Sequence, residues 1–333
     1  MLIIKYIQIN LSIFLLLSVF PLAAYAVNLT SVSVKGISQA YGFLLGQEYA
    51  LTRIKKDFPE LVSEVTVAQL QFNAAFPEMK SKLEGNLVQA LGKQASQDLL
   101  VNLQSQLQLK IAQQVITKDM ATGFLSEVKS RSKGNIESPV IEYLLAVKYE
   151  KNPSKEFSDG YRQKYQTDGL GKSQGVIVNL ELPRSWVAKE GKRPHIVQKW
   201  HSENGTGSEM IMLQVRDAEG ITLTKKDIDI LLRNGELKQS IPEDATYINS
   251  GKFTIETLPG YWVHYAMTME RAEISVYQEA LSYQFISKGK MISLMCQAGG
   301  DALLDRSKVN DSFQRIQPLC KQVLNSIVLP QLY

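Results

Sequence analysis

Three histidines are the residues best suited to metal binding or general acid–base chemistry in this chain of 333 residues. His195 and His201 lie in or beside one predicted strand, with both side chains expected on the same side. A strand rises about 3.3 Å per residue, so these two side chains stand about 20 Å apart and cannot share one metal ion. His264 falls in a later strand, on the side expected to face solvent. We therefore expect three isolated histidines, no metal site and no cofactor.

Cys296 and Cys320 are the candidates for nucleophilic or redox chemistry. No Cys-x-x-Cys pair and no setting that would lower a thiol pKa is recognisable, which disfavours a reactive cysteine. Cys296 alternates in phase with Leu294, whereas Cys320 shares a helical stripe with Phe313 and Ile316. Both thiols therefore face a core, which predicts a disulfide between a strand and the helix packed upon it. Because such a disulfide lowers the conformational entropy of the unfolded chain, it is expected to stabilise the fold by roughly 3–4 kcal/mol.

Serine and carboxylate motifs supply no recognisable site. No Gly-x-Ser-x-Gly sequence occurs. The carboxylate pairs Asp217/Glu219 and Asp227/Asp229 lack the further oxygen ligands of a Ca²⁺ loop, so turn and helix-cap roles fit them better. The tripeptide at 171–173 resembles the end of a phosphate-binding loop, but the required first glycine is a glutamine. The sequence thus predicts no catalytic residue and a protein that is not an enzyme.

Aromatic residues cluster in the second half of the chain, and Trp200 and Trp262 are the candidate binding residues among them. One interpretation is an aromatic-lined groove for a ligand or peptide. The other is packing in the core and across strands, which fits better because aromatic rings suit pleated surfaces. The cluster comprises Trp186, Trp200, Tyr261, Trp262, Tyr265, Tyr277 and Tyr283.

The N-terminal segment predicts export. Lys5 precedes an apolar stretch at 9–22, and the Ala-x-Ala sequence ending at Ala26 places small residues at −3 and −1 of a cleavage site before Val27. The apolar stretch is shorter than the ~20 residues of a spanning helix, so a cleaved signal peptide at 1–26 is favoured over an anchor. No later segment is long and apolar enough to span. We expect a mature chain without a stable membrane anchor, periplasmic or secreted.

The periodicity of apolar residues divides the mature chain into two domains. Residues 27–150 have helical spacing, and the stripe from Leu87 to Val115 is expected to form one amphipathic helix. Residues 151–174, rich in turn-forming residues, are expected to be a linker. From 175 to 333 the period is two, with helices at 224–237 and at the C-terminus. The predicted class is α+β: a helical domain, then a mostly antiparallel sheet with flanking helices.

Charge and polar composition exclude a nucleic-acid partner. Lys plus Arg is 37 and Asp plus Glu is 33, a net charge of +4 that is too small and too evenly spread for a nucleic-acid binder. The polar faces of the helical domain are unusually rich in glutamine. This suggests either a partner-binding surface or a solvated helix face, and the second fits better because glutamine is a good helix former. These glutamines are Gln89, Gln94, Gln97, Gln104, Gln106, Gln108, Gln113 and Gln114.

The segment from Gly175 to Leu329 resembles the PsbP/DcrB-type domain. The resemblance rests on Leu-Pro-Arg-Ser-Trp at 182–186, Thr-Leu-Pro-Gly-Tyr-Trp at 257–262 before a long meander, and a C-terminal helix ending in Asn-Ser-Ile-Val at 325–328. It implies a small α/β/α sandwich with a non-catalytic role in binding, assembly or envelope maintenance. No catalytic residue can be transferred, because the family shares none. The helical half resembles no family that we recognise.

Three functions agree with these features. The leading hypothesis is an exported, non-enzymatic binding or scaffold protein of the cell envelope that contacts a protein partner there or outside the cell. The second is a secreted factor acting on a host or neighbouring cell. The third is a hydrolase whose site assembles from residues scattered in the sequence.

Overall fold

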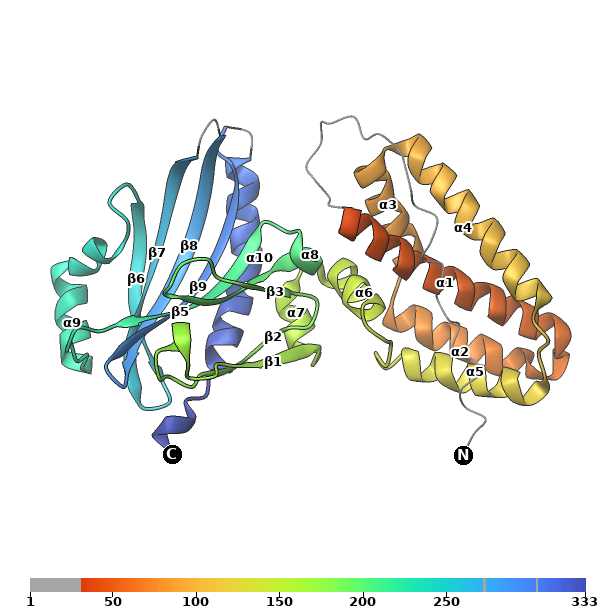
Figure 1. Ribbon diagram of the computed structural model, residues 1–333, viewed down its shortest axis with the longest axis horizontal. Helices are drawn as coiled ribbons and strands as arrows, with labels where there is room; N and C mark the ends of the chain where they lie inside the picture. The colour runs from red at the N-terminus through yellow and green to blue at the C-terminus, as the bar shows by residue number, and fades with distance from the viewer. Residues whose placement is uncertain (1–30, 272–273, 304) are drawn as a thin grey trace.

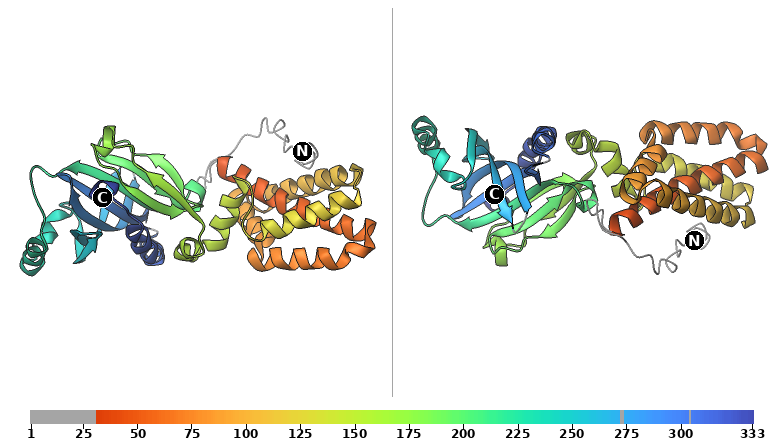
Figure 2. Two further views of the ribbon diagram at one scale, coloured as in Figure 1. Left: turned by 90° about the horizontal axis from the view of Figure 1, so that it is seen from below. Right: turned by 90° about the horizontal axis from the view of Figure 1, so that it is seen from above.

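The computed structural model describes residues 31–271, 274–303 and 305–333 (Figure 1). The predicted cleavage site between Ala26 and Val27 lies outside these residues. Two units follow one another along the chain: a helical unit, 31–149, and a sheet unit, 153–333. They lie side by side, with α6, α7 and α8 at their junction (Figures 1 and 2). None of the helices in the described part of the chain is long and apolar enough to cross a membrane.

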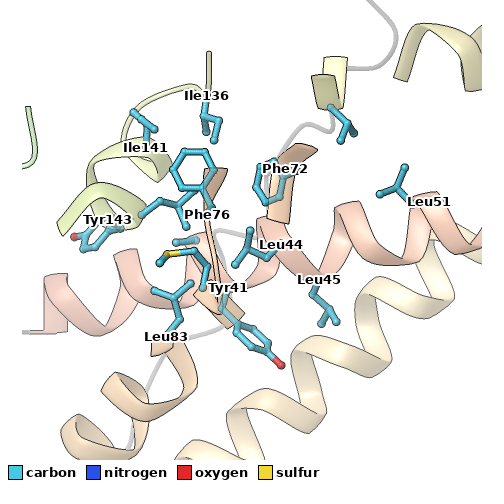
Figure 3. Packing of buried hydrophobic residues seen from close by; sticks show 14 of the residues in the cluster. Tyr41, Leu44, Leu45, Leu51, Phe72, Phe76, Leu83, Ile136, Ile141 and Tyr143 are labelled. Carbon is cyan, nitrogen blue, oxygen red and sulfur yellow. The ribbon is translucent and has the colours of Figure 1, made fainter. Parts of the chain in front are cut away.

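The helical unit is a bundle in which α1 is central, because α1 packs against each of the helices α2 to α6. Its core holds Tyr41, Leu45, Leu83 and Leu144, each at most 1% exposed (Figure 3). The elements are α1 (Ser31–Asp57), η2 (Pro59–Leu61), α2 (Val62–Ala75), α3 (Met79–Leu91), α4 (Lys93–Gln113), α5 (Lys118–Arg131) and α6 (Val140–Tyr149).

The apolar stripe from Leu87 to Val115 is divided between two helices, so the expected single helix is wrong. Gly92 ends α3 and precedes α4 with φ at 81°, a left-handed conformation that glycine adopts readily. Leu87 and Leu107 remain in the core, whereas Val115 lies beyond α4 and is 84% exposed. The eight glutamines named above are exposed, except Gln104, which is half-buried and donates to the Tyr41 hydroxyl.

The sheet unit combines a two-stranded ribbon, β1–β2, with a seven-stranded sheet in the order β3-β4-β5-β9-β8-β7-β6. All of these pairings are antiparallel, which confirms the expected α+β class. The strands are β1 (Arg162–Gln166), β2 (Asn179–Pro183), β3 (Val187–Glu190), β4 (Ile196–His201), β5 (Glu209–Asp217), β6 (Thr246–Ile255), β7 (Leu258–Arg271), β8 (Ile274–Ser287) and β9 (Lys290–Asp301). The helices are α7 (Pro153–Ser158), η3 (Gly171–Ser173), α8 (Ser202–Gly205), α9 (Lys225–Asn234), η4 (Glu236–Ser240), α10 (Arg306–Asn325) and η5 (Pro330–Leu332).

The two faces of the large sheet bury separate cores. Side chains alternate along β9, so Leu294 and Cys296 join the larger core while Met295 joins the smaller one. The α10 helix and the β1–β2 ribbon contribute to the larger core, and α9 contributes to the smaller one. Strand β8 runs without interruption through fourteen residues, Ile274–Ser287.

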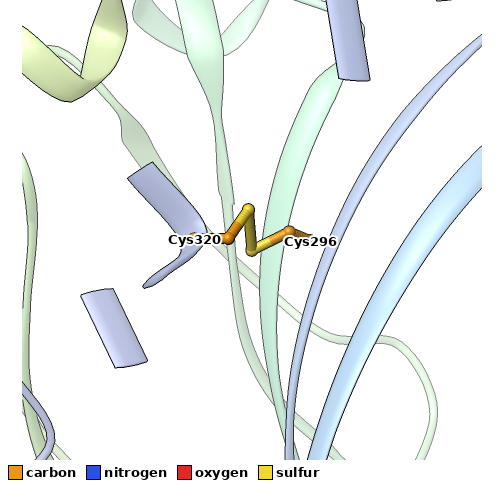
Figure 4. Close-up of a disulfide and its surroundings, with 2 residues drawn as sticks. All are labelled: Cys296 and Cys320. Carbon is orange, nitrogen blue, oxygen red and sulfur yellow. A yellow bond between two sulfur atoms is a disulfide. The ribbon is translucent and has the colours of Figure 1, made fainter. Parts of the chain in front are cut away.

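A disulfide joins Cys296 of β9 to Cys320 of α10 (Figure 4). Both cysteines are fully buried, and their Cα atoms are 6.1 Å apart, within the usual range for a disulfide. The bond fastens the helix to the centre of the sheet, as the stripe of Cys320 and the alternation of Cys296 predict.

The segment expected to be a linker, 151–174, is folded into the sheet unit. Asn152 caps α7 by accepting from the Lys155 N–H, and Pro153 occupies the first helical position. Phe157 is buried in the larger core, and β1 pairs with β2 along its whole length. The expectation of a linker is wrong because glycine and proline here form caps and tight turns between short elements.

Candidate functional site

The histidines are not brought together. His195 precedes β4 and His201 ends it, so they stand at opposite ends of one strand. Burial, followed by the nearby Lys189 and Lys199, lowers the pKa of His201 to about 4, so its imidazole is neutral at physiological pH. Burial and two arginines also lower the pKa of His195. Neither ring has a carboxylate partner that would raise its basicity among the interactions of the described residues.

His264 does not face solvent, contrary to expectation. Its side chain is 12% exposed, and Nε2 lies 2.7 Å from Glu279 Oε1. The ring also stacks on Phe313 of α10, with centroids 4.8 Å apart. His264 and Glu279 lie between the sheet and α10, because side chains alternate along β7 and those on the side of His264 point towards α10. Through these two contacts His264 joins β7 to β8 and to α10.

The two candidate binding tryptophans occupy different settings. Trp200 is fully buried, and Tyr165 packs edge-on against it with ring centroids 4.9 Å apart. Trp200 is therefore a core residue. Trp262 is half-buried and covers Gly251 of β6, where a Cβ atom would lie 2.7 Å from the indole. The Trp262 ring occupies the space beside Gly251 of the edge strand, where a residue with a Cβ atom would clash with the ring.

The carboxylate pairs have the turn and cap roles that the sequence predicts. Asp217 accepts from the Glu219 N–H and pairs with Lys290, while Asp227 forms a capping box with Thr224. Within the described ranges, no group of three or more His, Cys, Asp or Glu side chains could hold a metal ion.

A groove of about 880 Å³ lies between the β1–β2 ribbon and the C-terminal end of α10, and we call it the ribbon groove. Its floor is formed by β1 and by residues 179–181 of β2. Its walls are Phe157 and Ser158 of α7 on one side and residues 322–328 on the other. The last wall is held against the ribbon because Asn179 and Val328 exchange backbone hydrogen bonds and Ser326 Oγ accepts from the Glu181 N–H.

The ribbon groove contains polar groups that the fold does not satisfy. Arg162 pairs with Glu181 at 2.8 Å, but Lys164 has no ion pair among the described residues. Asn179 Oδ1 and Gln322 Oε1 are buried and have no hydrogen-bond partner among the described residues. Buried acceptors are usually satisfied, so a water molecule or a ligand would have to supply the missing N–H or O–H donors.

Beside the ribbon groove, the junction of the two units holds a buried carboxylate. Glu156 of α7 is 1% exposed and accepts from the Ser185 N–H and hydroxyl, at 2.8 and 2.7 Å. Burial raises the pKa of Glu156 to about 7, although its hydrogen bonds and Arg184 oppose this. Arg184 also pairs with Glu142 of α6 at 3.2 Å and so joins the helical unit to the sheet unit.

The α8 turn provides the other contact between the units. Glu203 and Asn204 have φ near 50°, a left-handed conformation that is strained for non-glycine residues. The Asn204 side chain hydrogen-bonds Tyr143 of α6. Below the turn, buried Glu209 binds Ser202 and Arg315, which ties α8 and β5 to α10. Ser202, Glu203, Glu209 and Arg315 line a small hollow between the units.

Several of these functional groups were not recognised from the sequence. Glu156 has a partial signal, because Asn152-Pro153 marks a helix start that would place it in a short helix. Asn179 and Gln322 have no such sequence signal, because they line one groove only when α10 packs beside the β1–β2 ribbon.

Comparisons with solved structures find similarity in about half of the chain, whereas no protein-family model and no curated protein matches it. Cyanobacterial PsbP (CyanoP) from Synechocystis is 14% identical over 51% of this chain and 92% of its own, with a TM-score of 0.34. The Saccharomyces cerevisiae Ran-binding protein Mog1p is 6% identical over 50% of this chain and 95% of its own, with a TM-score of 0.34. LpqN, involved in cell envelope biogenesis of Mycobacterium tuberculosis, is 12% identical over 54% and 96%, with a TM-score of 0.29. These structures, PsbP among them, are similar to part of the chain, and nothing about its function follows from the matches.

Proposed function

We propose that this protein is exported and acts as a non-enzymatic binding protein whose ribbon groove holds a segment of a partner protein. The signal-peptide pattern ending at Ala26 supports export, and the Cys296–Cys320 disulfide suits an oxidising compartment. The partner lies in the cell envelope or outside the cell.

The unsatisfied acceptors of the ribbon groove carry this proposal. Asn179 and Gln322 are far apart in the sequence of the sheet unit, but both line the ribbon groove, and their amide oxygens lack a partner among the described residues. Leaving a buried acceptor unpaired costs about 1–3 kcal/mol, which a bound ligand would recover. The candidate acid–base groups, in contrast, are dispersed. His201 has no carboxylate partner among the described residues. Glu156 holds the Ser185 hydroxyl, but both side chains are buried, Ser185 being 2% exposed.

Site-specific photo-crosslinking in the exporting cell tests the proposal. A photoreactive residue replaces Gln166, which is exposed and lines the ribbon groove. The matched control replaces Gln239, an exposed glutamine of η4 on the opposite side of the sheet. We expect a discrete protein adduct at 166, absent at 239 and lost when Lys164→Glu is added. Equal adducts at both positions, or none at 166, would refute binding through the groove.

A further inference from the structure

The outer edge of β1 has unpaired backbone groups. The Thr167 N–H donates to the Val178 carbonyl, and the Arg184 N–H donates to the Tyr161 carbonyl, so the hydrogen-bonded pairs with β2 fall on the odd-numbered residues of this strand. Hydrogen-bonded and non-hydrogen-bonded pairs alternate along an antiparallel ladder. The N–H and C=O groups of Lys164 and Gln166 therefore point away from β2. Within the described part of the chain they meet no partner, because β1 pairs with β2 alone.

The sheet edges of the unit differ in how far they are blunted against pairing. Edge strands are usually blunted by shortness, bulges or charge, because an open edge invites pairing with another chain. The β3 edge is four residues long, and the β6 edge carries a register shift between Tyr247 and Asn249. The β1 edge is five residues long and carries the charges of Arg162 and Lys164, but it pairs with β2 in continuous register, contains no proline, and borders the ribbon groove.

The groove and the edge together define the ligand. A strand added to an open edge gains main-chain hydrogen bonds, while every second side chain projects over one face of the sheet. On the groove face of the ribbon, such a side chain projects over the depression that Asn179 and Gln322 line. Their amide oxygens have no donor among the described residues and suit an ammonium, guanidinium or amide group. The unpaired ammonium of Lys164 on the same face suits a carboxylate elsewhere in the segment.

We infer that an extended segment of a partner protein binds as a third strand on the outer edge of β1 and inserts a donor-ended side chain into the ribbon groove. This inference rests on the proposed function and specifies its ligand as a polypeptide read mainly through its backbone. Main-chain pairing explains why the site needs few charged side chains.

The first test measures amide hydrogen exchange in the full mature chain with its disulfide intact. The probes are peptides selected from a random twelve-residue display library against the wild-type protein and then synthesised. We expect the Lys164 and Gln166 amides to exchange freely without peptide and to slow at least tenfold when it is bound. The Gln163 and Tyr165 amides, which already pair with β2, should change little. Bound peptide that leaves the 164 and 166 amides unprotected would overturn strand addition.

The second test separates backbone from side-chain recognition at one position. Gln166→Pro removes an outward N–H, which an edge strand tolerates, whereas Gln166→Ala keeps it. Both variants remove the glutamine side chain from the groove lining, and we expect the proline variant to bind the selected peptides at least tenfold more weakly than the alanine variant does. Circular dichroism and thermal melting verify the fold of each variant. Equal affinities for both variants would refute the inference.

Further outcomes distinguish the inference from the proposed function. If Gln166 crosslinks to a protein but the library yields no peptide that binds the groove, the proposed function stands and strand addition fails. If dissolved glycan fragments compete for the 166 crosslink and peptides do not, the ligand is a glycan and both fail. A dimer formed through β1, detected by light scattering and abolished by Gln166→Pro, would replace the partner segment by a second copy and also overturn the inference.

Discussion

Replacing Glu156 by Gln should remove a pH dependence from the stability of the sheet unit. The carboxylate is buried, and its pKa is raised from an ordinary 4.5 to about 7, chiefly by burial. The folded state therefore binds this proton more tightly than the unfolded state does. The stabilising contribution is fully present below pH 4.5 and is lost as the pH rises through 7.

The magnitude follows from the same two values. The interval between 4.5 and about 7, at 1.36 kcal/mol per pH unit, corresponds to about 3 kcal/mol of unfolding free energy. A glutamine at 156 carries no charge at any pH. It retains both contacts with Ser185, because its amide oxygen accepts from the N–H and its amide nitrogen donates to the hydroxyl oxygen. The variant should therefore be more stable than the wild type at pH 8, by up to about 3 kcal/mol.

Urea unfolding at pH values from 5 to 8 tests this prediction. Tryptophan fluorescence reports on the sheet unit alone, because the three tryptophans of the chain are Trp186, Trp200 and Trp262. The difference in unfolding free energy between Glu156→Gln and wild type should grow with pH across this range. Glu190→Gln is the matched control, since Glu190 is exposed and its pKa is lowered by Lys172. Parallel curves for Glu156→Gln and wild type would refute the reasoning.

Three further predictions concern the core of the sheet unit. Cys320→Ser should lower the unfolding free energy by about 3 kcal/mol, because it removes the disulfide between β9 and α10. The intact mass of the wild-type protein should rise by two hydrogens on reduction. Free thiols in protein taken from the exporting cell would contradict the disulfide. Trp200→Ala should cost about 3–5 kcal/mol, since the side chain is fully buried, and half-buried Trp262→Ala less; urea midpoints in the reverse order would exclude Trp200 as a core residue. His264→Ala should cost about 2–4 kcal/mol, because it leaves Glu279 buried without its partner, whereas His264→Gln, which can still donate to the carboxylate, should cost less and leave cellular function intact. Loss of function by folded, exported His264→Gln would instead point to an enzyme.

Local patterns predicted the fold class and much of the secondary structure. Alternation from Gly175 onwards placed most strands of the large sheet, and helical spacing placed α1, α2 and α10. Errors arose where a turn residue had more than one role. Gly92 divided a continuous apolar stripe, and the glycines and prolines near α7 capped short elements rather than marking a linker. These choices depend on what each segment packs against, which periodicity does not contain.

The sequence by itself determined the predicted export signal, the α+β class and the inward direction of both cysteines, because each depends on composition or spacing over a few turns. Tertiary structure decided the environment of the ionisable and polar groups. His264 was expected in solvent but lies under Phe313, and Glu156 was unremarkable in sequence but is buried against Ser185. The ribbon groove likewise exists because α10 returns to β2 after about 140 residues of chain, and Asn179 and Gln322 then share one hollow. Burial and pairing depend on contacts distant in sequence, and these contacts set the chemistry of a side chain.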